Sequence, residues 1–185
     1  DTRAHGRSGG ELVGIGYSEQ KDVRAVLAML RQRYPDKKFV LVGSSMGSVA
    51  CLYTARYQPL DVQGMVLDAP YATLADAVKG WWAFCGIRSL ALLLGPVAGI
   101  GSRMAGINLA EVRPIDLMDN MNGTKILLLT GDRDPIATPI NIESMSKKAG
   151  KNSSFHVFKE CTHGQIRAKY AYEFRDLLDR FLVEL

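Results

Sequence analysis

The fold of this chain is decided by the stretch "VLVGSSMGSVACL", residues 40–52, which carries a Gly-x-Ser-x-Gly pattern at 43–47. An apolar run at 39–42 leads into the pattern and predicts a buried strand. Apolar residues recur at helical spacing after the pattern and predict a helix at 46–56. Small residues on both sides of Ser45 allow a sharp turn between strand and helix, which would expose the Ser45 side chain above the strand end.

Strands and helices alternate along the rest of the chain as well. The spacing of apolar residues predicts helices at 17–33, with Ser18 as N-cap, at 139–149 and at 166–185, and strands at 62–67, 125–130 and 155–158. The run "KILLLT" at 125–130 is apolar almost throughout, as expected of a strand buried on both faces of a parallel sheet. This order predicts an α/β protein with a parallel sheet flanked by helices.

Residues 71–112 depart from this alternation, because they contain no strand signal. A connection of that length is unusual in such a fold. We therefore expect 71–112 to be an inserted helical cap, and 1–70 together with 113–185 to form the core.

Length, charge and cysteine content exclude several classes of protein. The 185 residues suffice for one domain, and a net charge of +4 without a basic block argues against nucleic acid as a partner. Cys51, Cys85 and Cys161 lack the spacing of a disulfide framework or a zinc site, so we expect free thiols in a reducing, cytoplasmic compartment. The apolar segment 89–102 is too short to span a bilayer. Because the chain opens at Asp1 instead of Met, a preceding segment could carry a signal or an anchor.

A serine hydroxyl becomes a nucleophile at neutral pH only when a base accepts its proton, and that base is commonly histidine. His163 lies in a loop just after the last predicted strand, where side chains reach the carboxyl edge of a parallel sheet. His156 lies inside that strand and His5 lies in the glycine-rich opening, so both are weaker candidates. His163 is therefore the expected base for Ser45.

An acid must orient such a base. The segment "TGDRDP" follows the "KILLLT" strand directly and offers Asp132 and Asp134, while Asp68 at the end of the preceding strand competes with them. Ser45, Asp134 and His163 each follow a separate predicted strand, in the order nucleophile, acid, base. This order favours Asp134 as the acid.

Several segments of the chain resemble the α/β-hydrolase superfamily, in particular its esterase, monoacylglycerol-lipase and serine-aminopeptidase-like branch. The similar segments span nearly the whole chain and are "DTRAHGRSGG" at 1–10, "GSSMGS" at 43–48, "LDAPY" at 67–71, "AGINLAEVRPID" at 105–116, "GDRDPIATP" at 131–139 and "CTHG" at 161–164. Ala4 replaces a glycine that is usual in this branch, and Ser44 stands where Glu, His or Gln is commoner.

The resemblance implies a serine hydrolase that cleaves a carboxylic ester, thioester or amide through an acyl-enzyme. Ser45 would be the nucleophile, Asp134 the acid and His163 the base. The N–H of Met46, at the start of the helix after Ser45, would donate to the oxyanion. The resemblance implies no metal and no organic cofactor, and it makes His5 a structural residue.

The resemblance also implies that the first strands of the fold precede Asp1, together with a loop that supplies the second oxyanion N–H. We therefore expect this chain to be the C-terminal portion of a longer protein, with the N-terminal segment of the same protein as its partner. Without that segment the strand at 39–42 would keep an unpaired apolar edge, which is an expected site of aggregation.

The predicted cap is rich in large apolar residues, among them Trp81, Trp82 and Leu90. These side chains could form the internal core of the cap, or line a pocket above the serine for a small, apolar acyl substrate. Contact with a membrane surface is a third alternative, which Arg88 and Arg103 beside the apolar segment permit.

Two other functions are compatible with the same residues. A binding or scaffold protein of this fold would keep the motifs without turnover. An acyltransferase would use the same three side chains with an acceptor other than water.

Overall fold

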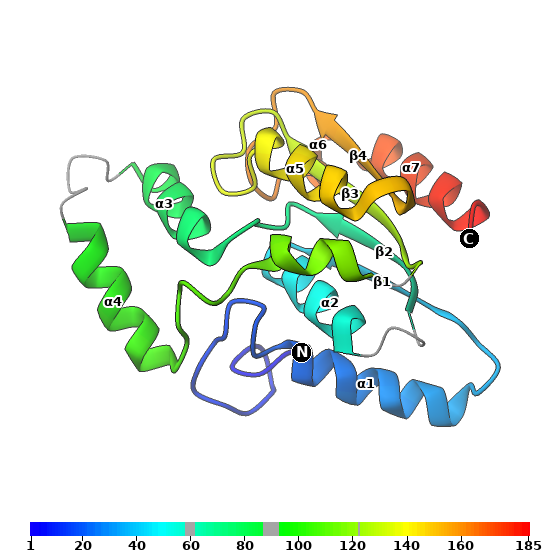
Figure 1. Ribbon diagram of the computed structural model, residues 1–185, viewed down its shortest axis with the longest axis horizontal. Coiled ribbons are helices and arrows are strands. Elements are labelled where there is room, and N and C mark those ends of the chain that lie inside the picture. The colour runs from blue at the N-terminus through cyan, green and yellow to red at the C-terminus, as the bar shows by residue number, and fades with distance from the viewer. Residues whose placement is uncertain (58–61, 87–92, 122) are drawn as a thin grey trace.

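A four-stranded parallel sheet forms the centre of the computed structural model, which describes residues 1–57, 62–86, 93–121 and 123–185 (Figure 1). The strands lie in the order β1 (Phe39–Ser44), β2 (Val62–Asp68), β3 (Lys125–Gly131) and β4 (Ser153–Phe158), and each neighbouring pair is parallel. The core helices are α1 (Gln20–Arg33), α2 (Met46–Tyr57), α5 (Pro139–Ala149), α6 (Ile166–Lys169) and α7 (Ala171–Val183), with the 3-10 helices η3 (Pro114–Asn120) and η4 (Gly150–Asn152). The predicted α/β fold class is confirmed.

Alternate residues of the strands point to opposite faces of the sheet, and each face packs against its own helices. On one face, Met65 and Leu67 of β2 pack with Leu52 of α2 and with residues of α5 and η3. On the other face, Val66 packs in a cluster that includes Phe181 of α7. Every residue of β3 after the first is buried, which confirms that the "KILLLT" strand is covered on both faces.

β1 lies at one edge of the described sheet and pairs only with β2 there. Its Val42 side chain is 53% exposed, whereas β2 and β3 are almost fully buried. Aggregation through this edge stays a prediction.

The helix predicted at 17–33 begins later, at Gln20, and Ser18 does not cap it. The residue before the helix is Glu19, whose carboxylate turns back and accepts two backbone N–H groups from the preceding loop. Those bonds hold residues 14–19 in a turn where the apolar pattern predicts the first helical residues, so this local side-chain contact decides where the helix starts.

The closing helix predicted at 166–185 is interrupted. α6 ends at Lys169, Tyr170 leaves the helical conformation with φ −127° and ψ 40°, and α7 follows. The apolar face predicted for this segment still packs on the sheet, with Phe174 and Leu177 against the cluster around Val66.

Two helices, α3 (Leu74–Phe84) and α4 (Leu94–Ala105), follow β2 and stand away from the sheet at one end of the molecule (Figure 1). Thr73 caps α3 by accepting the N–H of Asp76 at 3.1 Å. No strand occurs in the described part of 71–112, although the division into a core and a separate cap stays a prediction. Among the described residues, no helix is both long and apolar enough to cross a membrane.

Candidate active site

Ser45 lies at the turn between β1 and α2 in a left-handed conformation, with φ +51°. Its N–H donates to the carbonyl of Asp68 at 2.7 Å. A Cβ at Gly43 would lie 2.5 Å from the Gly47 carbonyl group, so the close approach of strand and helix requires glycine there. At Gly47 a Cβ would meet no described atom within 4 Å. A left-handed non-glycine residue is strained, and such strain concentrates at functional sites.

The structure brings together the three side chains that the sequence singles out. The Ser45 Oγ lies 2.8 Å from His163 Nε2, and His163 Nδ1 lies 2.8 Å from Asp134 Oδ2. The side chain of His163 is 10% exposed and that of Asp134 is 1% exposed. Bulk water therefore has little access to the two bonds.

The hydrogen-bond partners fix the tautomer of the imidazole. A carboxylate only accepts hydrogen bonds, so His163 Nδ1–H is the donor to Asp134 Oδ2. His163 Nε2 is then free to accept from the Ser45 hydroxyl. The other Asp134 oxygen, Oδ1, accepts the N–H groups of Ile136 and Ala137, each at 2.8 Å. Both oxygens are engaged, so the carboxylate is held in one orientation.

The loops that carry Asp134 and His163 are joined by backbone bonds. The N–H of Asp132 donates to the carbonyl of Phe158 at 2.9 Å, and the N–H of Arg133 donates to that of Cys161 at 3.0 Å. Gly131 permits this contact, because a Cβ at that position would collide with the Cys161 carbonyl. These backbone hydrogen bonds therefore help to fix the distance between Asp134 and His163.

The side chains of the other candidate residues have other hydrogen-bond partners. The Asp132 carboxylate accepts the N–H of Cys161 at 3.3 Å, and Asp68 accepts from Ser44 at 3.0 Å. His156 pairs with a glutamate of α7, and His5 bonds within the N-terminal loop, its Nδ1 lying 2.8 Å from the Arg3 carbonyl oxygen.

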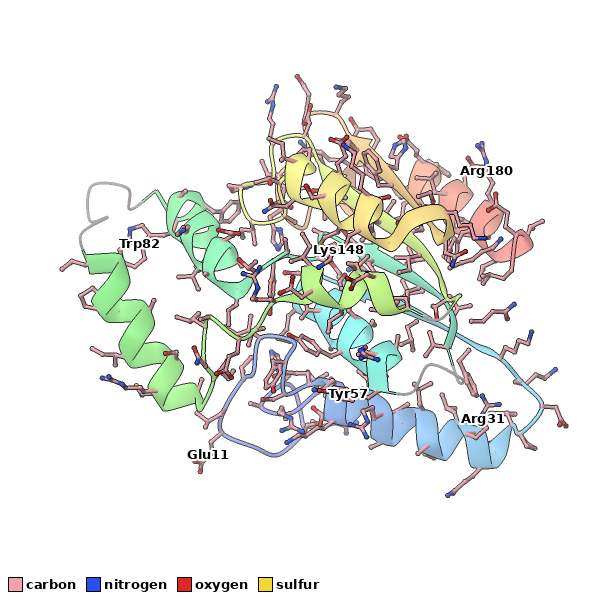
Figure 2. The ribbon with its side chains drawn as sticks, viewed as in Figure 1. Glu11, Arg31, Tyr57, Trp82, Lys148 and Arg180 are labelled. Atoms are coloured by element: carbon pink, nitrogen blue, oxygen red, sulfur yellow. The ribbon has the colours of Figure 1, made fainter. Side chains whose placement is uncertain are left out.

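A cavity of about 410 Å³ opens above Ser45 and is lined mostly by apolar side chains. From α3 come Leu74, Ala77, Val78, Trp81 and Trp82, and from α4 come Val97 and Ala98. Figure 2 shows Trp82 near the end of α3 that lies closer to α4. The two predicted pocket tryptophans therefore line the cavity, while Leu90 lies outside the described residues.

Sequence reasoning missed the loop at 14–16, whose Ile15 lines the same cavity. Glu19 is fully buried and accepts the N–H of Gly14 at 2.6 Å and of Gly16 at 2.7 Å. Tyr71 donates its hydroxyl to the carbonyl of Ile15 at 2.5 Å. The two glycines in "GIG", followed by a glutamate, are the only signal of this turn in the sequence.

The N–H of Met46 belongs to the first residue of α2, where a helix offers no intrahelical acceptor. This leaves it available beside Ser45, and its donation to an oxyanion stays a prediction.

Solved structures of several hydrolases share this fold. The esterase Pf2001 of Pyrococcus furiosus superposes with a TM-score of 0.80 at 19% identity, over all of this chain and 68% of that one. A thermophilic esterase from Thermogutta terrifontis superposes with a TM-score of 0.67 at 16% identity, over all of this chain and 78% of that one. These likenesses show an α/β-hydrolase fold.

Sequence comparison adds a relative and a family. The uncharacterized protein YqkD of Bacillus subtilis is 24% identical over 98% of this chain, which spans 60% of the length of that relative. The model of the family described as serine aminopeptidase, S33, matches residues 1–102, more than half of the chain. With its parallel sheet and hydrolase fold, the chain therefore belongs to the S33 serine aminopeptidase family of α/β-hydrolases.

Proposed function

We propose that the protein is a serine hydrolase that cleaves a carboxylic ester, thioester or amide with an apolar acyl group. The observation that carries the proposal is the continuous pair of 2.8 Å contacts from Ser45 Oγ through His163 to Asp134. A nucleophile bonded to a base, and that base bonded to an acid, is the arrangement that activates a serine hydroxyl.

In the proposed reaction, Ser45 Oγ attacks the acyl carbon while His163 Nε2 takes its proton. The imidazolium that forms is stabilised by Asp134 and then gives its proton to the leaving group as the acyl-enzyme forms. Water, deprotonated by the same Nε2, releases the acid and restores Ser45. The N–H of Met46 would donate to the oxyanion at both stages.

The cavity above Ser45 supports the choice of substrate. Among the described residues, no acidic side chain lines the cavity. The lining therefore offers no carboxylate to pair with the α-ammonium group of a peptide. Side chains such as Trp81, Trp82 and Ile136 suit an uncharged hydrocarbon group instead. We therefore place esters of apolar acids ahead of aminopeptidase substrates.

Replacing the nucleophile or the base tests the proposal. Ser45→Ala and His163→Ala should each lower kcat/KM for p-nitrophenyl butyrate by about three orders of magnitude or more, because removal of either one stops the nucleophilic step. In the unmodified protein, kcat/KM should fall toward acidic pH, because a protonated imidazole cannot accept the proton of Ser45.

His156→Ala is the matched control, since it removes a histidine that bonds to α7 and not to Ser45. It should keep the activity. Activity retained by Ser45→Ala or His163→Ala would contradict the proposal.

A further inference from the structure

The loop at 14–16 forms part of the cavity wall, and the mechanism above gives it no part. Its Ile15 lines the cavity together with Ser45 and His163. The backbone of Ile15 lies in the left-handed region, with φ +48°. A β-branched residue is an outlier there, because its Cβ crowds its own backbone. Such strain persists only where the surrounding structure imposes it.

Two side chains hold the loop in this conformation. Glu19 is fully buried, and its carboxylate accepts the N–H of Gly14 at 2.6 Å and that of Gly16 at 2.7 Å. Tyr71, which is also buried, donates its hydroxyl to the carbonyl of Ile15 at 2.5 Å. The backbone of Ile15 and of both its neighbours is therefore fixed.

The loop packs against the residue that follows the nucleophile. A Cβ at Gly16 would lie 2.7 Å from the carbonyl oxygen of Met46 and 2.7 Å from the Cβ of Val49, so Gly16 lies directly on the first turn of α2. Ile15 is therefore held at the end of the cavity that contains Ser45. Helices α3 and α4 supply most of the remaining wall.

Folding alone does not account for an isoleucine at this position. The Ile15 side chain is 42% exposed, so it gains only part of the stabilisation of a buried apolar residue. Glycine would adopt the same backbone conformation without strain. A strained backbone that carries a half-exposed apolar side chain into the cavity points to contact with a bound ligand.

We propose that Ile15 is a specificity-determining residue that crowds the acyl group beside Ser45 and excludes esters branched at the carbon next to the acyl carbon. Glu19 and Tyr71 are positioning residues that act through the loop. This inference rests on the proposed function, since it names the substrate class of the same site. That class is esters of straight-chain apolar acids.

Two isomeric esters test the proposal by kinetics. p-Nitrophenyl valerate and p-nitrophenyl pivalate have the same leaving group and the same number of carbon atoms, and only the pivalate is branched beside the acyl carbon. Ile15→Gly should raise kcat/KM for the pivalate about tenfold and change that for the valerate by less than about twofold, because only the branched group meets the side chain that is removed.

Ala4→Gly is the matched control for the change in backbone. Ala4 is also left-handed, with φ +55°, and is not among the residues that line the cavity. Its replacement should leave kcat/KM for both esters unchanged.

Tryptophan fluorescence measures binding without catalysis. The chain has two tryptophans, Trp81 and Trp82, and both line the cavity, so their fluorescence reports its occupation. The pentyl and neopentyl ethers of p-nitrophenol match the two esters in shape, have no acyl carbon to attack, and quench tryptophan through the nitrophenyl group. Ile15→Gly should bind the neopentyl ether about tenfold more tightly than the unmodified protein does, and the pentyl ether equally well.

Tyr71→Phe tests the positioning role of the hydroxyl. The variant loses the bond to the Ile15 carbonyl and keeps the aromatic ring, so the preference should shift toward the branched compounds by about threefold. Tyr170→Phe is the matched control, because the Tyr170 hydroxyl also donates to a backbone carbonyl, that of Lys159 at 2.9 Å, and Tyr170 does not line the cavity. An unchanged preference in Tyr71→Phe would overturn the role given to Tyr71.

Thermal melting shows whether the variants fold, and the melting temperature of Ile15→Gly should not fall, since glycine relieves the strain. If Ile15→Gly does not fold, Ile15→Ala, which also removes the branched side chain, should show the same shift. An unchanged preference between the two ethers in a folded Ile15 variant would overturn the proposal. An unmodified protein that hydrolyses neither ester would contradict the proposed function instead, and the ether titration would still test the role of Ile15.

Discussion

At the scale of the residue, the pattern around Ser45 predicts the turn, while the partners of Ser45 depend on contacts across the fold. Gly-x-Ser-x-Gly between an apolar run and a helix indicates a strand-to-helix turn because few other residues allow it. The choice among Asp68, Asp132 and Asp134 is not determined by local sequence. It depends on contacts between residues 29 positions apart in the chain, Cys161 N–H with the Asp132 carboxylate and His163 with Asp134.

Gly43 provides a prediction at this scale. A Cβ at this position would lie 2.5 Å from the backbone of Gly47. Gly43→Ala should therefore lower the free energy of unfolding by about 2 kcal/mol, within the range for overpacking, and should displace Ser45 and reduce activity. Urea unfolding and ester hydrolysis measure the two effects.

Gly101→Ala, at an exposed position inside α4 with open space around it, is the matched control. It should leave activity unchanged and should not lower the free energy of unfolding, because alanine favours a helix over glycine. Equal stability of Gly43→Ala and the unmodified protein would show that the turn has room for a side chain.

At the scale of the element, apolar periodicity predicts where the strands and helices occur, but it does not predict the residues at which they begin and end. α5 has the predicted bounds because Pro139 and Gly150 mark its ends in the sequence itself. α1 starts three residues late because Glu19 bonds to the loop before it, a contact that periodicity does not encode.

The start of α1 is also tied to the N-terminal loop through Asp22. Arg3 donates to both carboxylate oxygens of Asp22, with its Nη2 2.7 Å from Oδ1. This hydrogen-bonded pair lowers the pKa of Asp22 below its ordinary value of 3.8. The stabilisation is therefore complete above that value and is lost as the pH falls through the lowered pKa.

Asp22→Asn should lower the free energy of unfolding by about 1 kcal/mol at pH 7, and the difference should shrink as the pH falls through the lowered pKa of Asp22. Urea unfolding at a series of pH values measures it. Asp36→Asn, in an exposed loop, is the control and should have little effect at any pH. A deficit in Asp22→Asn that keeps its full size throughout the acid range would contradict the ion-pair explanation.

At the scale of the whole molecule, the cavity is built from segments that lie far apart in the chain. Ile15, Trp81 and Ile136 come from an N-terminal loop, from α3 and from the segment after β3. The sequence indicates an apolar cap, whereas the identity of the lining residues depends on how α3 packs over the carboxyl ends of the strands. The loop containing Ile15 could not be assigned because its contacts are made by Tyr71 and Glu19.

Trp81 offers a test of the cavity as an acyl site, since it lines the cavity and is 55% exposed, so the fold should tolerate its loss. Trp81→Ala should lower kcat/KM for p-nitrophenyl octanoate about tenfold and that for the acetate ester less than twofold, because only the longer chain loses apolar contact. Ile100→Ala, on an exposed part of α4, should leave both values unchanged. Equal losses for the two esters would place the acyl chain elsewhere.

The central claim is that Ser45 is an activated nucleophile, and covalent labelling with a fluorophosphonate probe tests it most directly. Mass spectrometry of the digested protein should find one adduct, on the peptide that contains Ser45, and Ser45→Ala should take up no label. His163→Ala should label far more slowly, because the hydroxyl then has no base. An adduct on another serine, or full labelling of Ser45→Ala, would contradict the account.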